Sequence, residues 1–69
     1  MRELIFTKHA KERLKDRFPG FKETDLARLF QDADKYYSSG GVDYYRSRAY
    51  EYIVRQNGKT FVLITFYKF

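Results

Sequence analysis

Apolar residues recur at every fourth position near the start of the chain, the spacing that places them on one side of a helix. They are Ala10, Leu14 and Phe18. Thr7 precedes this stripe and is a good N-cap, because its hydroxyl can accept from a free amide of the first turn. We therefore predict a first helix over about residues 8–18. Pro19-Gly20 ends it, because the residue before a proline resists helical backbone.

A second apolar stripe predicts another helix over about residues 24–35. Its members are Leu26, Leu29, Phe30 and Ala33. The helix is expected to begin at Thr24 or the preceding Glu23, with Asp25 in the first turn, where negative charge suits the helix dipole. The short connection makes the two helices a helical hairpin.

The rest of the chain carries strand and turn signals. Residues 44–56 read as one strand, and Asn57-Gly58 after it suits the positive φ angles of a type I′ turn. Residues 61–69 are apolar nearly throughout, so we place this returning strand in the middle of the sheet.

Two further segments extend the sheet. The sequence SSGG at 38–41 predicts a small hairpin in which Tyr36-Tyr37 pairs with Tyr44-Tyr45. The short apolar stretch at residues 2–6 is either a first strand or an extended lead-in to the first helix.

These elements predict one α+β domain over residues 1–69, with two N-terminal helices packed on one face of a three- to four-stranded antiparallel sheet. A register in which Gln56 faces Lys59 assigns the two faces, because alternate strand residues point to opposite sides. The more aliphatic face is expected to meet the helices; it carries Ile53, Val62 and Ile64. The face expected to be open carries Arg46, Arg48, Tyr50, Tyr52 and Tyr67.

The composition indicates a basic protein with exposed aromatic rings. The chain has 14 Lys and Arg against 9 Asp and Glu, a net charge of +5, with seven Tyr and seven Phe. A domain of 69 residues cannot bury all fourteen rings, so some are expected to face water or a partner. Basic charge beside exposed rings is typical of nucleic-acid binding, and RNA is the partner we expect.

Several classes of protein are disfavoured by what the chain lacks. There is no cysteine, and a single histidine with scattered carboxylates does not suggest a metal site, so we expect neither a metal nor another cofactor. No apolar run is long enough to cross a membrane, and no signal peptide is recognisable. We therefore expect a cytoplasmic protein without membrane contact.

The first helix carries the candidate chemistry. His9, Arg13 and Arg17 lie four residues apart, so they form one row beside the buried stripe. His9 lies in the first turn, where the helix dipole disfavours imidazolium, and neutral imidazole is the form that a general base needs. Two structural alternatives remain: the arginine stems cover apolar surface, or Arg13 pairs with Glu51 on the helix-facing side of the sheet.

The open face is the second candidate site. Arg46, Tyr44, Tyr50 and Tyr52 are the residues we expect to contact RNA there, since rings stack bases and guanidinium groups bind phosphate. The alternatives are cross-strand tyrosine pairs that stabilise the sheet, or contact with a protein, including a second copy of the chain. The predicted register places Tyr67 and the helix row on opposite sides of the sheet.

The stretch His9-Ala10-x-x-Arg13-x-x-x-Arg17 resembles the HAxxRxxxR signature of a small bacterial and phage family of unknown function. Ile64-Thr65-Phe66-Tyr67 resembles the apolar run that ends members of this family. The family looks related to the RelE and BrnT toxins. The resemblance implies a RelE-like fold, a metal-independent endoribonuclease or a descendant of one, and an antitoxin as partner. It points to His9, Arg13, Arg17 and, by position, Tyr67.

The sequence therefore supports two possible functions. In the first, a toxin-type RNA-binding protein cleaves RNA by attack of a 2′-hydroxyl on the adjacent phosphate. His9 is then the base, and Arg13, Arg17 or Arg48 stabilises the developing charge. In the second, a small phage- or bacterium-encoded inhibitor binds a host protein through its tyrosine-rich face, without catalysis.

Overall fold

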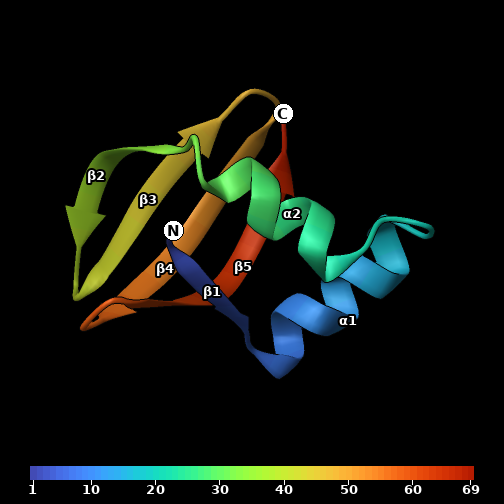
Figure 1. The fold of residues 1–69 in the computed structure, drawn as a ribbon, viewed down its shortest axis with the longest axis horizontal. Helices are drawn as coiled ribbons and strands as arrows, with labels where there is room; N and C mark the ends of the chain where they lie inside the picture. Colours follow the sequence, from blue (N-terminus) through green and yellow to red (C-terminus); the bar gives the residue numbers. More distant parts are fainter.

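Two helices and five strands make up the fold, which a computed structural model describes over residues 1–69 (Figure 1). In chain order they are β1 (Glu3–Phe6), α1 (Lys8–Arg17), α2 (Glu23–Phe30), β2 (Asp34–Ser39), β3 (Val42–Ser47), β4 (Tyr50–Asn57) and β5 (Thr60–Lys68). The fold class is α+β, with both helices on the same side of one sheet. Neither helix is long and apolar enough to cross a membrane.

The sheet has the strand order β1-β5-β4-β3-β2. β1 runs parallel to β5, and the other three pairs are antiparallel. The predicted sheet of three or four antiparallel strands, and with it the expected RelE-like arrangement, is therefore wrong: the sheet is five-stranded and mixed. The parallel pair arises because the chain returns to β1 only after both helices and three strands, a long-range contact that local sequence does not indicate.

An unmarked turn supplies the additional strand. Residues 44–56, predicted as one strand, are divided by a turn at Arg48-Ala49 into β3 and β4. Arg48 adopts a positive φ of 49°, a conformation that residues other than glycine, asparagine and aspartate rarely take. No glycine, asparagine or proline marks this turn in the sequence, so the reversal was not predicted.

Both helices begin near their predicted starts, but the second ends early. The Thr7 hydroxyl accepts a hydrogen bond from the Ala10 amide at 3.2 Å, as expected of an N-cap. α2 ends at Phe30 instead of continuing to residue 35. Its end is stabilised by the Arg2 guanidinium, which donates to the carbonyl oxygens of Phe30 at 2.9 Å and Ala33 at 2.7 Å.

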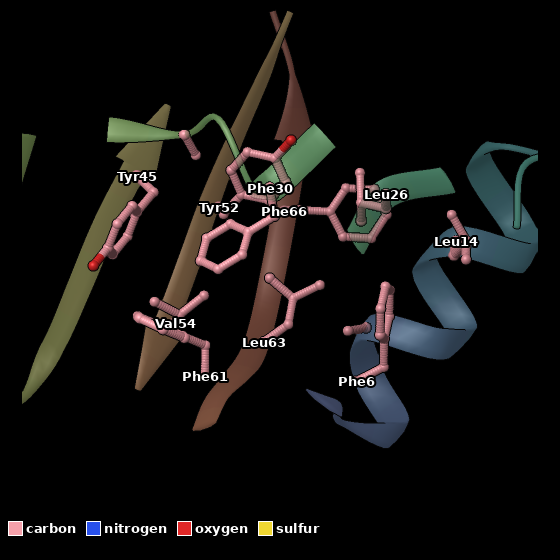
Figure 2. Packing of buried hydrophobic residues seen from close by; sticks show 12 residues of the cluster. Phe6, Leu14, Leu26, Phe30, Tyr45, Tyr52, Val54, Phe61, Leu63 and Phe66 are labelled. Atoms are coloured by element: carbon pink, nitrogen blue, oxygen red, sulfur yellow. The ribbon is translucent and has the colours of Figure 1, made fainter. Parts of the chain in front are cut away.

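The core lies between the helices and the aromatic face of the sheet, so the two predicted faces are exchanged over β4 and the first half of β5, whereas Arg46 and Tyr67 keep their predicted place on the open face. Figure 2 shows Tyr45, Tyr52, Val54, Phe61 and Leu63 directed towards the helix side. The Phe30 ring of α2 packs within 5.1–5.3 Å, centroid to centroid, of the rings of Tyr45, Tyr52 and Phe61. The aromatic face is the covered one because Phe30 of α2 packs against it, together with Phe18 and Phe21 from the connection between the helices.

The exchange removes two tyrosines from the predicted RNA surface. Tyr52 is fully buried, and its hydroxyl lies 2.7 Å from the Ser47 hydroxyl. Burial raises the pKa of Tyr52, and the bond to Ser47 opposes this rise. Tyr50 packs against Phe18 and Phe21 on the same side. Neither ring faces the uncovered side of the sheet, so the prediction that they contact RNA there is wrong.

A bulge in β5 decides where its last residues point. Gln56 pairs with Phe61, two positions beyond the predicted Lys59, and Val54 pairs with Leu63. The next pair is Ile53 with Thr65, so Ile64 is an extra residue. An extra residue reverses the alternation of side chains that follow it. Phe66 consequently joins the core, and Tyr67 points to the uncovered face.

Candidate functional site

The second half of β5 has no strand on its β1 side, and α1 occupies this free edge. β1 pairs only with Thr60–Leu63. The Thr7 hydroxyl donates to the Leu63 carbonyl at 2.8 Å, and Arg13 Nε donates to the Phe66 carbonyl at 2.7 Å. Exposed carbonyls of an edge strand need partners, so the start of α1 is fixed against the edge by its own side chains.

This contact brings Arg13 onto Tyr67. The guanidinium carbon lies 4.6 Å from the centroid of the Tyr67 ring, which is 43% exposed. Only Nε of Arg13 is hydrogen-bonded, so its two terminal nitrogens have no partner within the protein. The prediction that Tyr67 and the helix row lie on opposite sides is wrong, because α1 lies at the sheet edge and Arg13 reaches across it.

His9 and Arg17 lie one helical turn before and one turn after Arg13 on α1. Together with Arg13 they line one small polar hollow, in which Glu12 and Asp16 are the acidic neighbours. His9 and Arg17 are exposed, and neither makes a hydrogen bond or ion pair with the rest of the protein. The row predicted from its spacing is thus assembled in the folded chain, with Arg13 as its oriented member.

A second arginine stacks on tyrosine on the uncovered face. The Arg46 guanidinium carbon lies 4.1 Å from the Tyr36 ring centroid and 5.1 Å from that of Phe69. Its Nε lies 4.0 Å from a carboxylate oxygen of Glu51, and the other oxygen of Glu51 accepts from the Tyr36 hydroxyl. This hydrogen bond is the main reason that the pKa of Tyr36 is raised.

Glu51 lies on the strand between the two arginine positions and is not the partner of Arg13. It faces Arg46 in the β3–β4 pairing and Tyr67 in the β4–β5 pairing. The alternative in which Arg13 and Glu51 form a structural pair is therefore wrong. Arg13 is held by the Phe66 carbonyl and by the Tyr67 ring instead.

A second bulge gathers tyrosines beside Arg46. Lys35 pairs with Tyr45 and Tyr37 pairs with Tyr44, so Tyr36 is an extra residue in β2. Two consecutive rings therefore turn towards Tyr44, at centroid distances of 6.2 Å for Tyr36 and 5.3 Å for Tyr37. Both rings are about half exposed, at 45% and 54%.

These groups form one surface, which we call the arginine–tyrosine surface. It comprises Arg13, Tyr67, Arg46, Tyr36, Tyr37, Tyr44 and Phe69. Tyr36, Tyr37 and Phe69 were not among the predicted site residues. The SSGG sequence did predict a hairpin that places Tyr36 and Tyr37 opposite Tyr44–Tyr45. Nothing in the sequence indicated the bulge that turns both rings to one side.

Arg48 stands apart from this surface. It is exposed in the turn between β3 and β4 and makes no contact with a ring or carboxylate of the protein. The turn does lie at the end of the sheet where the chain terminates, because the Phe69 amide donates to the Ala49 carbonyl at 2.7 Å.

No group of three or more histidine, aspartate or glutamate side chains lies close enough together to hold a metal ion. Comparison of the chain with protein-family models, with curated proteins and with solved structures finds no match. The resemblance to a toxin-related family therefore stays a prediction that rests on the motif residues of α1 and β5.

Replacing Arg13 measures how much its contacts contribute to the stability of the fold. Arg13→Ala removes the hydrogen bond to Phe66 and the stacking on Tyr67, and we expect a loss of about 1–2 kcal/mol in the free energy of unfolding. Arg17→Ala, one turn further on and without such contacts, is the control and should change that free energy by less than about 0.5 kcal/mol. Urea unfolding measures both, and equal losses would contradict the assigned contacts.

Proposed function

We propose that this protein is a toxin-type RNA-binding protein that holds single-stranded RNA on the arginine–tyrosine surface. The observation that carries the proposal is the pair of guanidinium groups, Arg13 and Arg46, each stacked on a half-exposed tyrosine on a sheet face without helices. Stacking leaves the terminal nitrogens of Arg13 free for phosphate, while rings nearby remain accessible to bases.

The surface favours unpaired strands over duplexes. Its rings protrude from a sheet, and a base can stack on such a ring only if it is unstacked from its own neighbours. No helix protrudes from this face to enter a groove, because α2 covers the other side and α1 lies along the β5 edge. The net charge of +5 supports attraction of any polyanion, and the tyrosines would add preference for accessible bases.

Cleavage is a second step that the helix row supports. His9 is exposed one turn before Arg13, in the same polar hollow. In the proposed reaction His9 accepts the proton of a 2′-hydroxyl, whose oxygen attacks the adjacent phosphorus while the bond to the 5′-oxygen breaks. Water protonates the leaving 5′-oxygen, and Arg13 and Arg17 stabilise the charge on the phosphoryl oxygens. The products are a 2′,3′-cyclic phosphate and a 5′-hydroxyl.

Binding is tested with a fluorescein-labelled, mixed-sequence single-stranded RNA in an anisotropy titration. We expect Arg46→Gln and Tyr37→Ala each to weaken binding by about 5-fold or more, since both remove contacts on this surface. Arg28→Gln, an equal change of charge on the helix side, should weaken it by less than about 2-fold. Affinity should also fall steeply as salt rises.

Two results would contradict the binding proposal. Equal weakening by Arg46→Gln and Arg28→Gln would reduce the interaction to general charge attraction. Absence of RNA binding together with salt-insensitive binding of one protein would favour the alternative, in which the tyrosine-rich face serves a small inhibitor of a host protein.

Cleavage is tested separately with His9→Ala, using Lys8→Ala as the control on the same helix. Wild type and Lys8→Ala should cleave RNA in the presence of EDTA and leave 2′,3′-cyclic phosphate ends, whereas His9→Ala should bind RNA without cleaving it. Equal cleavage by His9→Ala would remove His9 from the reaction. Binding without cleavage by all three proteins would restrict the function to binding.

A further inference from the structure

The two flanks of α1 carry different cations. Arg13 and Arg17 lie on the flank beside β5, where they belong to the site described above. Lys11 and Lys15 lie on the opposite flank. Each lysine follows a residue of the buried stripe, whereas each arginine precedes one, so the two kinds of cation fall on opposite sides of the stripe. The lysine flank has no role in the proposed RNA site.

The lysine flank borders an apolar hollow at the turn between the helices. Leu14, Phe18 and Phe21 supply its apolar lining, and Lys11, Lys15 and Lys22 stand around it with Glu23 as the acidic member. Phe18 and Phe21 are half-buried, so part of each ring remains accessible. No lysine here has a carboxylate within 4.0 Å, since the single ion pair of the structure joins Arg46 and Glu51.

The rings in this hollow are less suited to RNA bases than those on the sheet. Phe18 packs against Phe66 at 5.4 Å, and Phe21 stacks on Tyr50 at 5.9 Å with an interplanar angle of 18°. These rings are thus part of the internal aromatic cluster, and what they leave exposed suits an apolar side chain. Lysine also lacks the planar fork with which arginine binds phosphate in two-point contacts.

We propose that the hollow docks an acidic amphipathic helix of a partner protein. Lys11 and Lys15 are one helical turn apart, about 6 Å along the axis at 1.5 Å per residue. Two carboxylates four residues apart on a helix lying alongside α1 have the same spacing. An apolar side chain from the adjoining stripe of that helix fills the space over Leu14, Phe18 and Phe21. The charge of the rim selects an acidic partner over a basic one.

The docking site is distinct from the arginine–tyrosine surface. The hollow lies at the turn between α1 and α2, on the helix side of the sheet, whereas Tyr36, Tyr44 and Arg46 lie on the uncovered face. The protein can therefore hold a partner helix and a nucleic acid at the same time. The inference does not depend on whether the sheet face binds RNA.

The test uses a labelled synthetic peptide helix with glutamates and leucines in adjoining stripes, each at i, i+4 spacing, and a second peptide of the same composition in scrambled order. Anisotropy should show saturable binding of the first peptide. Reversing the rim charges in Lys11→Glu/Lys15→Glu should weaken it by about 10-fold or more, because two attractions become repulsions. Lys35→Glu/Lys59→Glu, an equal change of charge on β2 and the β4–β5 turn, should weaken it by less than about 2-fold.

Several outcomes would overturn the proposal. They are absence of saturable binding, equal binding of the scrambled peptide, and equal weakening by the two double variants. Displacement of the peptide by single-stranded RNA would assign the lysine flank to the nucleic-acid surface instead. Thermal melts establish that the variants are folded. If Lys11→Glu/Lys15→Glu does not fold, the milder Lys11→Ala/Lys22→Ala variant takes its place and should weaken binding by about 3-fold or more.

Discussion

The free edge of β5 is the constraint on which the site depends. β1 accompanies β5 only from Thr60 to Leu63, so the carbonyls beyond that point need other partners. Thr7 and Arg13 provide them, and in doing so they fix the direction of α1 and the position of the Arg13 guanidinium. The β5 bulge at Ile64 then turns Tyr67 to the face where that guanidinium can rest on it. The contacts that complete the sheet edge thereby also place the Arg13 guanidinium over the Tyr67 ring.

The size of the domain explains why one sheet face is left uncovered. Two short helices supply enough apolar surface to cover one side of a five-stranded sheet, and that side takes the aromatic core around Phe30. The other side keeps its rings and arginines in contact with water. There, Arg46 and Tyr36 are held by Glu51, so these three side chains are oriented by one another.

Local patterns predicted the parts of the structure that depend on local chemistry. The Thr7 cap and the alignment of His9, Arg13 and Arg17 follow from helix geometry and were found from spacing alone. The pairing of Tyr37 with Tyr44 followed from the glycines at 40–41, which both adopt positive φ.

Tertiary contacts decided the rest. A turn at Arg48 has no sequence signal, because the pairing of β3 with β4 imposes the positive φ that arginine disfavours. The extra residues Ile64 and Tyr36 shift their registers without any change in hydrophobic pattern. The faces of β4 and of the first half of β5 were exchanged because the side that meets the helices is chosen by packing against the Phe30 ring of α2 and not by aliphatic content.

We propose that RNA lies on the uncovered face. It is tested most directly by titrating the ¹⁵N-labelled protein with a short single-stranded RNA and mapping the amide shift changes. We expect changes in β2, in β3 and at Tyr67–Phe69, with α2 unaffected. Changes concentrated in α2 and in the turn between the helices, or none at a saturating RNA concentration, would contradict it.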